Sequence, residues 1–178
     1  MTLTIVTTAG ATDANSYCSL AEAEAYAATV VDSTVWVAKT DEQKKAAIIQ
    51  AARWMNTFQW VGMRSSQTQA MAWPRCEQYT VRFDGLITDG TGYLLDQDGY
   101  QVASDTIPVF IKNANADLAM RQVSEDWTKG MGSVTTDSMK VGTIQQGRKT
   151  YRSIPASTLA YIRFFLLVQA TGGRLVRG

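Results

Sequence analysis

The residue types that carry most enzyme chemistry are sparse in this chain, which contains no histidine and two cysteines. Without histidine, the Ser-His-Asp and Cys-His arrangements, an imidazole general base and mixed Cys/His zinc sites are all excluded. Cys18 and Cys76 lie far apart in the sequence and are expected to be buried free thiols. The acidic neighbours Glu125 and Asp126 are typical of a solvated helix surface. We therefore expect a protein that is not an enzyme and that needs no metal or cofactor.

One acidic motif has the spacing of a metal site. Asp96-Gln97-Asp98-Gly99 is similar to the beginning of a calcium-binding loop, but the glutamate that would complete such a loop is missing downstream. An ordinary turn is therefore favoured. The sequence also lacks the glycine-rich motifs that bind phosphates and dinucleotides.

The basic residues near the C-terminus are the remaining candidates for binding. Four of them form a cluster that could contact DNA phosphates or line a channel: Lys140, Arg148, Lys149 and Arg152. Tyr151 adds one ring that could stack on a base. A solvated cationic hairpin, a protein contact and a DNA contact are all compatible with this pattern.

The chain ends in a short segment that is both apolar and basic. Arg174, Leu175, Val176 and Arg177 follow a pair of glycines. The segment is either a frayed tail or a linear motif that becomes ordered on a partner, with its two apolar side chains buried and its arginines paired.

Charge is divided unevenly along the chain. Residues 1–106 hold seven Lys/Arg and twelve Asp/Glu, a balance of 7 − 12 = −5, whereas residues 107–178 hold ten and four, a balance of 10 − 4 = +6. The sum is the net charge of +1. Two oppositely charged poles favour oriented assembly over a uniformly basic surface for nucleic acid.

Helical periodicity dominates the elements that must position these residues. The clearest helix spans residues 107–127, where Pro108 suits the first turn and apolar residues recur at three- and four-residue spacing. Capping-box patterns predict helices over residues 19–28 and 40–59. A last helix is expected to begin at Ile154-Pro155.

Between the helices, the sequence predicts loops and hairpins. Residues 30–39 are expected to form a loop anchored by Trp36. Turn residues at short intervals predict a projecting hairpin loop over residues 84–106, and β-prone residues predict a β-hairpin or arm over residues 134–152. Residues 169–178 are expected to form an extended C-terminal tail.

The predicted fold class is mainly α: a bundle of about four helices with inserted β-hairpin loops, in a single domain over residues 1–178. The 46% hydrophobic content is typical of a folded globular protein. No secretory signal and no apolar run of membrane-spanning length is present. We expect a protein without a membrane partner that is soluble and intracellular when it is made.

Trp73, Pro74 and Arg75 are the candidate structural anchor. The proline restricts the residue before it to an extended or turn conformation, so the Trp73 ring is held at a defined place. Burial in the core is the favoured interpretation of this ring, and a hot spot for a partner is the alternative.

Five groups of residues occur in a fixed order along the chain. They are Ala14-Asn15-Ser16-Tyr17 followed by Ser19 and Glu22-Ala23-Glu24-Ala25-Tyr26; Gly62 with Arg64; Gln69-Ala70 with Trp73-Pro74-Arg75; Ile107-Pro108 with Lys112, Ala114 and Leu118-Ala119; and Val141-Gly142 before Ile154-Pro155. In this order the motifs resemble the head-to-tail connector, or adaptor, proteins of tailed bacteriophages, and the resemblance covers nearly the whole chain.

This resemblance implies a structural protein of the virion neck, made in the host cytoplasm. Such a protein forms a homo-oligomeric ring, usually of twelve subunits, that joins the portal protein to a tail or neck protein and lets DNA pass without sequence specificity. Docking on the portal is expected from the Arg174 to Arg177 tail. The residues expected to face a neighbouring subunit or the tail are Tyr93, Leu94 and Leu95.

Related sequences are also described as single-stranded-DNA-binding proteins similar to the primosomal DnaT protein. A DNA-binding module of phage replication is therefore the alternative function, with the cationic arm as its binding surface. Salt separates the two, because binding to phosphates weakens steeply as salt rises, whereas docking through buried Leu175 and Val176 depends on it less.

Overall fold

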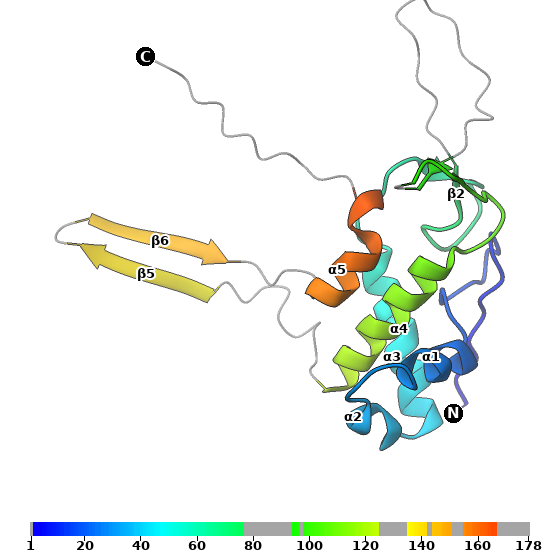
Figure 1. Cartoon of the computed structure of the whole chain (residues 1–178), viewed down its shortest axis with the longest axis horizontal. Helices are drawn as coiled ribbons and strands as arrows, with labels where there is room; N and C mark the ends of the chain where they lie inside the picture. Colours follow the sequence, from blue (N-terminus) through cyan, green and yellow to red (C-terminus); the bar gives the residue numbers. More distant parts are fainter. Residues whose placement is uncertain are drawn as a thin grey trace, which may run out of the picture.

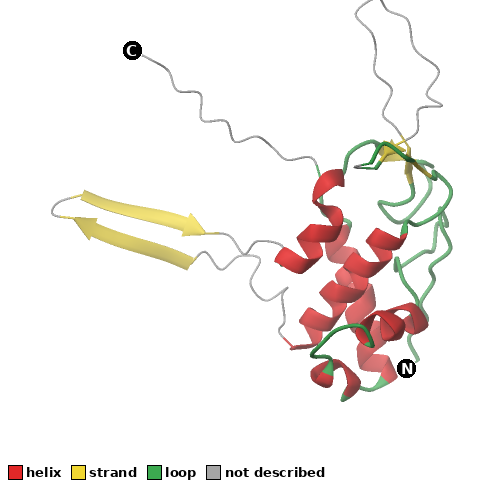
Figure 2. Ribbon diagram, in the orientation of Figure 1, coloured by secondary structure: helices red, strands yellow, loops and turns green. Residues whose placement is uncertain are grey.

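The computed structural model describes residues 2–76, 94–96, 98–124, 135–141, 144–150 and 155–166. Figure 1 and Figure 2 show a helical body with strand pairs at its margin and beyond it. The helices are α1 (Leu20–Ala27), α2 (Thr34–Val37), α3 (Asp41–Met55), α4 (Val109–Ser124), α5 (Ala156–Ile162) and the 3₁₀ helix η2 (Arg163–Phe165). The strands are β1 (Met63–Arg64), β2 (Arg75–Cys76), β3 (Leu94–Leu95), β4 (Gln101–Val102), β5 (Thr135–Val141) and β6 (Ile144–Thr150).

Two helices begin where the capping-box motifs predict. At the start of α1, the hydroxyl of Ser19 accepts a hydrogen bond from the N–H of Glu22, and the carboxylate of Glu22 accepts one from the N–H of Ser19. Thr40 and Gln43 make the same reciprocal pair at the start of α3. Each box satisfies N–H groups that have no partner inside the helix, and both predicted starts are confirmed.

The segment around Trp36 departs from the prediction. Residues 30–39 do not form only a loop, because Thr34–Val37 form the short helix α2. Four helical residues are too few to produce a helical period in the sequence. Trp36 itself is 1% exposed and anchors the segment in the core, as expected.

The long helices differ from their predicted bounds at the ends. α3 ends at Met55 instead of near Gln59, because a turn brings Trp60 back against the helix, where its indole N–H donates to the carbonyl of Met55 (3.1 Å). α4 begins at Val109, one residue after the proline that was expected in its first turn. The predicted end of that helix, beyond residue 124, lies outside the described residues.

α4 is the central helix of the body, and α1, α2, α3 and α5 all pack against it (Figure 1). Its buried apolar residues are Ile111, Leu118 and a set of alanines that lets neighbouring helices approach closely. The helix-rich class predicted from the sequence is confirmed, although the described residues contain five α-helices instead of about four. None of the described helices combines the length and the apolar character of a membrane span.

A buried amide on α4 connects three parts of the body. The side-chain oxygen of Asn115 accepts hydrogen bonds from the hydroxyl of Ser16 (3.1 Å), the N–H of Tyr17 (3.3 Å) and the thiol of Cys18 (3.4 Å). Its amide nitrogen donates to the carbonyl of Ile48 on α3 (3.2 Å). Asn115 is fully buried, so these bonds replace all contact with water and fix the N-terminal segment and α3 relative to α4.

A buried carboxylate two residues further along α4 holds α5. One oxygen of Asp117 accepts hydrogen bonds from the hydroxyls of Ser157 (2.7 Å) and Thr158 (2.6 Å), and Arg121 on α4 donates to the same oxygen (3.3 Å). The other oxygen lies 3.4 Å from the hydroxyl of Tyr26 on α1. Charged groups are rarely buried without such partners, so these bonds fix where α5 packs.

In the described ranges, three antiparallel strand pairs accompany the helices: β1 with β2, β3 with β4, and β5 with β6. The first two are short and lie beside the body, whereas β5 and β6 are seven residues each and project from it in Figure 1. The pairing of β5 with β6 agrees with the β-hairpin expected within residues 134–152. The predicted projecting loop over residues 84–106 is described only from residue 94, where β3 and β4 form a hairpin.

Replacing Asn115 by alanine is expected to lower the free energy of unfolding by about 2–4 kcal/mol, because the buried N–H of Tyr17 and thiol of Cys18 lose their acceptor and the carbonyl of Ile48 loses a donor, whereas the hydroxyl of Ser16 keeps the carbonyl of Cys18 (2.8 Å). Urea denaturation followed by tryptophan fluorescence measures the change. Asn113→Ala is the matched control on the same helix, since Asn113 is only half-buried, and it should cost less than about 1 kcal/mol. Equal losses in the two variants would contradict the role of the Asn115 amide.

Candidate binding surfaces

Trp73 lies in the core and connects the segment after α3 to two helices. It is fully buried, and its ring makes edge contacts with Trp60, Phe110 and Phe165 at centroid distances of 5.6–5.7 Å. The peptide bond to Pro74 is cis. Aromatic edge contacts of this kind stabilise a core beyond the area they bury. Full burial leaves no part of this ring for a partner.

Arg75 is the hydrogen-bond centre of the same segment. Its guanidinium donates to four backbone carbonyls: those of Val61 (2.8 Å), Ala72 (3.1 Å), Trp60 (3.4 Å) and Gly62. Burial lowers the pKa of Arg75, and the nearby Arg64 adds to the effect. The planar fork of an arginine reaches several carbonyls at once, so Arg75 holds two stretches of irregular chain together.

Gly62 is the point where these stretches approach most closely. It has a φ of +74°, and a Cβ at this position would collide with the carbonyl of Cys76 and with the side chain of Leu94. Only glycine combines this backbone conformation with so little space. Glycine is therefore required at position 62, where the chain after α3 packs directly against Cys76 and Leu94.

The three loop residues expected to face a neighbouring subunit or the tail are Tyr93, Leu94 and Leu95, and the two that the structure describes differ in exposure. Leu94 is buried and belongs to the core of this same chain, so its side chain does not face outward. Leu95 is 50% exposed, and Tyr100 in the same hairpin is 72% exposed. Tyr93 lies outside the described residues.

The turn between β3 and β4 uses its acidic motif locally. One oxygen of Asp96 accepts hydrogen bonds from the N–H groups of Asp98 (3.0 Å) and Tyr100 (2.8 Å). Gly99 adopts a φ of +84°, which such a turn requires. This geometry agrees with the ordinary turn favoured over a calcium loop.

Three of the four candidate DNA-contact residues lie on the projecting hairpin: Lys140 in β5, and Arg148 and Lys149 in β6. The register places Asp137 directly opposite Arg148 and Thr136 opposite Lys149. The cationic stretch of sequence therefore has an acidic residue within it. Arg152 and the tail residues Arg174, Leu175, Val176 and Arg177 lie outside the described residues.

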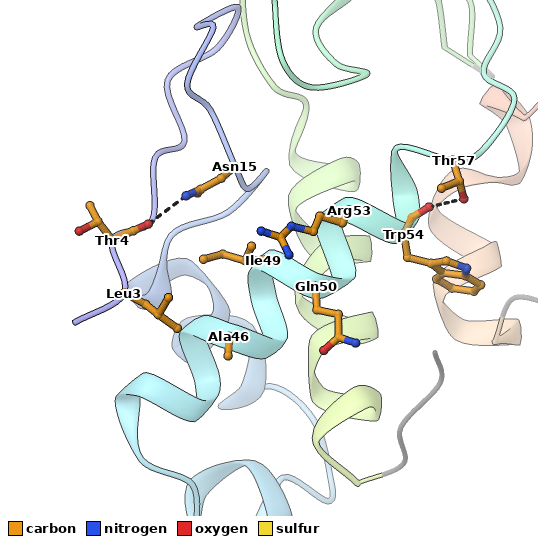
Figure 3. Close-up of a pocket in the computed structure, with 9 residues that line it drawn as sticks. All are labelled: Leu3, Thr4, Asn15, Ala46, Ile49, Gln50, Arg53, Trp54 and Thr57. Atoms are coloured by element: carbon orange, nitrogen blue, oxygen red, sulfur yellow. Dashed lines mark hydrogen bonds between the residues drawn. The ribbon is translucent and has the colours of Figure 1, made fainter. Parts of the chain in front are cut away.

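Figure 3 shows a groove that the sequence did not reveal, between the N-terminal segment and the outer face of α3. Its volume is about 610 Å³, and its walls include Leu3, Asn15, Ile49, Arg53 and Trp54. The side chain of Asn15 binds the chain beside it, donating to the carbonyl of Thr4 (2.9 Å) and accepting from the N–H of Val6 (2.9 Å). Periodicity predicts α3 but does not show that an extended segment runs along it.

Reactive chemistry in the described part of the chain is limited. Burial raises the pKa of the Cys18 thiol to about 12, so this cysteine is protonated at neutral pH. Cys76 is also a free thiol, and it is only half-buried, which corrects the expectation that both cysteines are buried. In the same residues, no three Cys, Asp or Glu side chains are placed to hold a metal ion.

Comparison with known families gives a match over most of the chain. The model of a family described as "Putative DnaT-like ssDNA binding protein" matches residues 1–159. The chain belongs to this family. The match spans the helical body, the groove and the projecting hairpin, and it ends within α5. No curated protein and no solved structure matches the DnaT-like chain significantly.

Replacing Arg75 by lysine is expected to lower the free energy of unfolding by about 2–4 kcal/mol. An ammonium group keeps the charge but cannot reach all four carbonyls, so buried acceptors lose their donor. Chemical denaturation measures the difference. Arg64→Lys is the matched control, because Arg64 is exposed and makes one long hydrogen bond (3.4 Å), and it should cost about 0.5 kcal/mol or less.

Proposed function

We propose that this DnaT-like protein is a head-to-tail adaptor of a tailed bacteriophage, a structural and non-enzymatic component of the virion neck. In this role it forms a ring beneath the portal protein, joins the DNA-filled head to a tail or neck protein, and continues the channel through which DNA passes. It is made in the host cytoplasm and assembles with the particle. The resemblance of its ordered motifs to adaptor proteins is the starting point of the proposal.

The observation that carries the proposal is the projecting hairpin. β5 and β6 pair over seven residues each and, among the described residues, no third strand continues their sheet. An isolated two-stranded hairpin is marginally stable in water, and both of its outer edges carry backbone groups that can pair with another chain. A hairpin of this kind is suited to strand addition between subunits or onto the portal.

The uneven distribution of charge along the sequence also supports a role in assembly. The balance of −5 over residues 1–106 and +6 over residues 107–178 gives the chain two poles. Complementary poles orient subunits during association and exclude wrong orientations. The register of the hairpin pairs Asp137 with Arg148, so the cationic sequence of the hairpin also includes an acidic residue.

Binding of single-stranded DNA is the second candidate, and the description of the matching family favours it. The surface would be the cationic hairpin with Lys140, Arg148, Lys149 and Arg152. Four phosphate contacts would make log K fall with log salt at a slope of about −3, since each contact to a single strand contributes roughly −0.7. Assembly of an adaptor ring does not require this steep dependence on salt.

Deleting residues 172–178 is expected to abolish attachment to the portal and leave the melting of the helical body unchanged, because these residues follow the described body. Electron microscopy of particles made with the deletion should show DNA-filled heads without tails and without a ring below the portal. A charge-preserving control, Arg174→Lys with Arg177→Lys, keeps Leu175 and Val176 and should still attach.

Complete tailed particles in the absence of this protein would refute the adaptor function. Binding of a single-stranded oligonucleotide over a salt series then tests the second candidate. A slope near −3 that becomes shallower by about 1.4 when Arg148 and Lys149 are changed to glutamine would support DNA binding by the hairpin.

A further inference from the structure

A hollow lined by aromatic rings lies between α4, α5 and η2, and it is named here the aromatic hollow. Its volume is about 270 Å³, and its rings are those of Phe110, Tyr161, Phe164 and Phe165. Phe110 and Phe165 stack on each other with their centroids 4.6 Å apart, and the ring of Phe164 stands at 82° to that of Phe165. Phe164 is 51% exposed, so part of its ring is open to a ligand.

Two carboxylates complete the wall of the aromatic hollow. They belong to Asp96 and Asp98, in the turn between β3 and β4. Asp96 uses one oxygen for N–H groups of its own turn, whereas the side chain of Asp98 is exposed and has no hydrogen-bond or ion-pair partner among the described residues. Arg163 is the only base in this lining, which therefore has a formal charge of 1 − 2 = −1.

An exposed ring beside a carboxylate without a partner is the chemistry that recognises a guanidinium group. The planar cation of an arginine stacks on an aromatic face, and its N–H groups donate to a carboxylate at the edge of that face. The hollow has the volume of about nine water molecules, at roughly 30 Å³ each. It therefore suits one or two side chains of an extended segment and is too small for a helix.

This chain contains a segment of that chemistry directly after the hollow. Residues 167–178 lie outside the described residues; they include Arg174 and Arg177, with Leu175 and Val176 between them, and hold no Asp or Glu. Their charge of +2 is opposite in sign to that of the hollow. They follow Leu166, the neighbour of Phe165, and the eight residues from Leu166 to Arg174 can span up to about 28 Å. The glycine pair before Arg174 permits the chain to turn back.

We propose that the aromatic hollow binds the Arg174 to Arg177 segment of the same molecule. One arginine stacks on Phe164 and donates to Asp98, and an apolar side chain between the arginines covers the neighbouring rings. The short covalent link keeps the segment at an effective concentration on the order of millimolar, which favours it over the segment of another copy. The inference rests on the proposed function for its consequence: the segment that docks on the portal is held on its own body until the portal displaces it.

Disulfide trapping of the full-length protein tests this contact. In a Cys76→Ser background, the test variant carries Ala160→Cys in the hollow and Val176→Cys in the segment; Cys18 remains, because it is buried. Ala160 lines the hollow at an exposed position and contributes neither a ring nor a charge. With glutathione disulfide as the oxidant, the two thiols should lose two hydrogen atoms and form an intramolecular bond. The product is a monomer that migrates faster on a non-reducing gel.

The matched control replaces Ala160→Cys by Gln59→Cys. Gln59 is exposed and precedes Trp60, the residue with which Leu166 pairs, so it lies near the point where the segment leaves the described body. It does not line the hollow. The control should form its disulfide about tenfold more slowly, the ratio that corresponds to 1.4 kcal/mol of contact energy.

Changes of charge test the chemistry of recognition. In the Ala160→Cys, Val176→Cys variant, Asp98→Asn should slow disulfide formation about threefold, and Arg174→Gln with Arg177→Gln about tenfold. Asp105→Asn removes the same charge from an exposed position outside the hollow and should leave the rate unchanged.

Disulfide-linked dimers in place of the fast-migrating monomer would assign the hollow to the segment of another copy and overturn the proposal. Equal rates for the Ala160→Cys and Gln59→Cys variants, or rates that do not respond to Asp98 and the arginines, would overturn it as well. These results are separable from failure of the adaptor function. A normal intramolecular disulfide in a protein that is dispensable for tailed particles would refute the function alone. Loss of portal attachment on deletion of residues 172–178, without a preference for Ala160→Cys, would refute the contact alone.

Discussion

The side-chain amide of Asn115 is the interaction on which the body depends. It lies in the middle of the central helix, where every face is covered, and a polar group buried there without partners would cost several kcal/mol. The N-terminal segment supplies three donors and α3 supplies the acceptor. Apolar packing alone tolerates small slips between helices, whereas this set of bonds is satisfied in one arrangement.

The same arrangement extends to the aromatic part of the core. Tyr17, whose N–H binds Asn115, donates its hydroxyl to Asn56, and Asn56 accepts the N–H of Ala72 (2.8 Å). Trp73 follows at once, and Arg75 then holds the neighbouring carbonyls. A line of buried hydrogen bonds therefore runs from α4 to the segment that contains the structural anchor. Salt bridges such as Lys112 to Glu22 (2.6 Å) are more exposed, and they add less.

This construction suits an assembly protein. The body is held together by buried amide, guanidinium and carboxylate groups that do not face solvent, and so its surface is available for contacts. The β5–β6 hairpin projects from the helical body in Figure 1. Membership of the DnaT-like family is compatible with both an adaptor and a DNA-binding module, and the two differ in whether the hairpin pairs with protein or with phosphates.

Local sequence signals determined much of the fold. Capping boxes marked the starts of α1 and α3, apolar spacing marked α4, and turn residues marked the β3–β4 hairpin, because each of these depends on neighbours within a few residues. The short helix α2 and the early end of α3 were missed. Both are set by where Trp36 and Trp60 pack, which no local pattern encodes.

For the candidate binding surfaces too, some properties could be predicted from the sequence and others depended on the tertiary structure. Composition excluded histidine-based chemistry, and counting residues gave an acidic first part and a basic last part of the sequence. Tertiary structure alone decided that Leu94 faces inward while Leu95 faces outward. It also decided that Asp137 lies opposite Arg148. Valines and aromatic rings are exposed near opposite ends of α4 for the same reason. Exposure and juxtaposition arise from contacts between segments far apart in the sequence, and periodicity within one segment cannot report them.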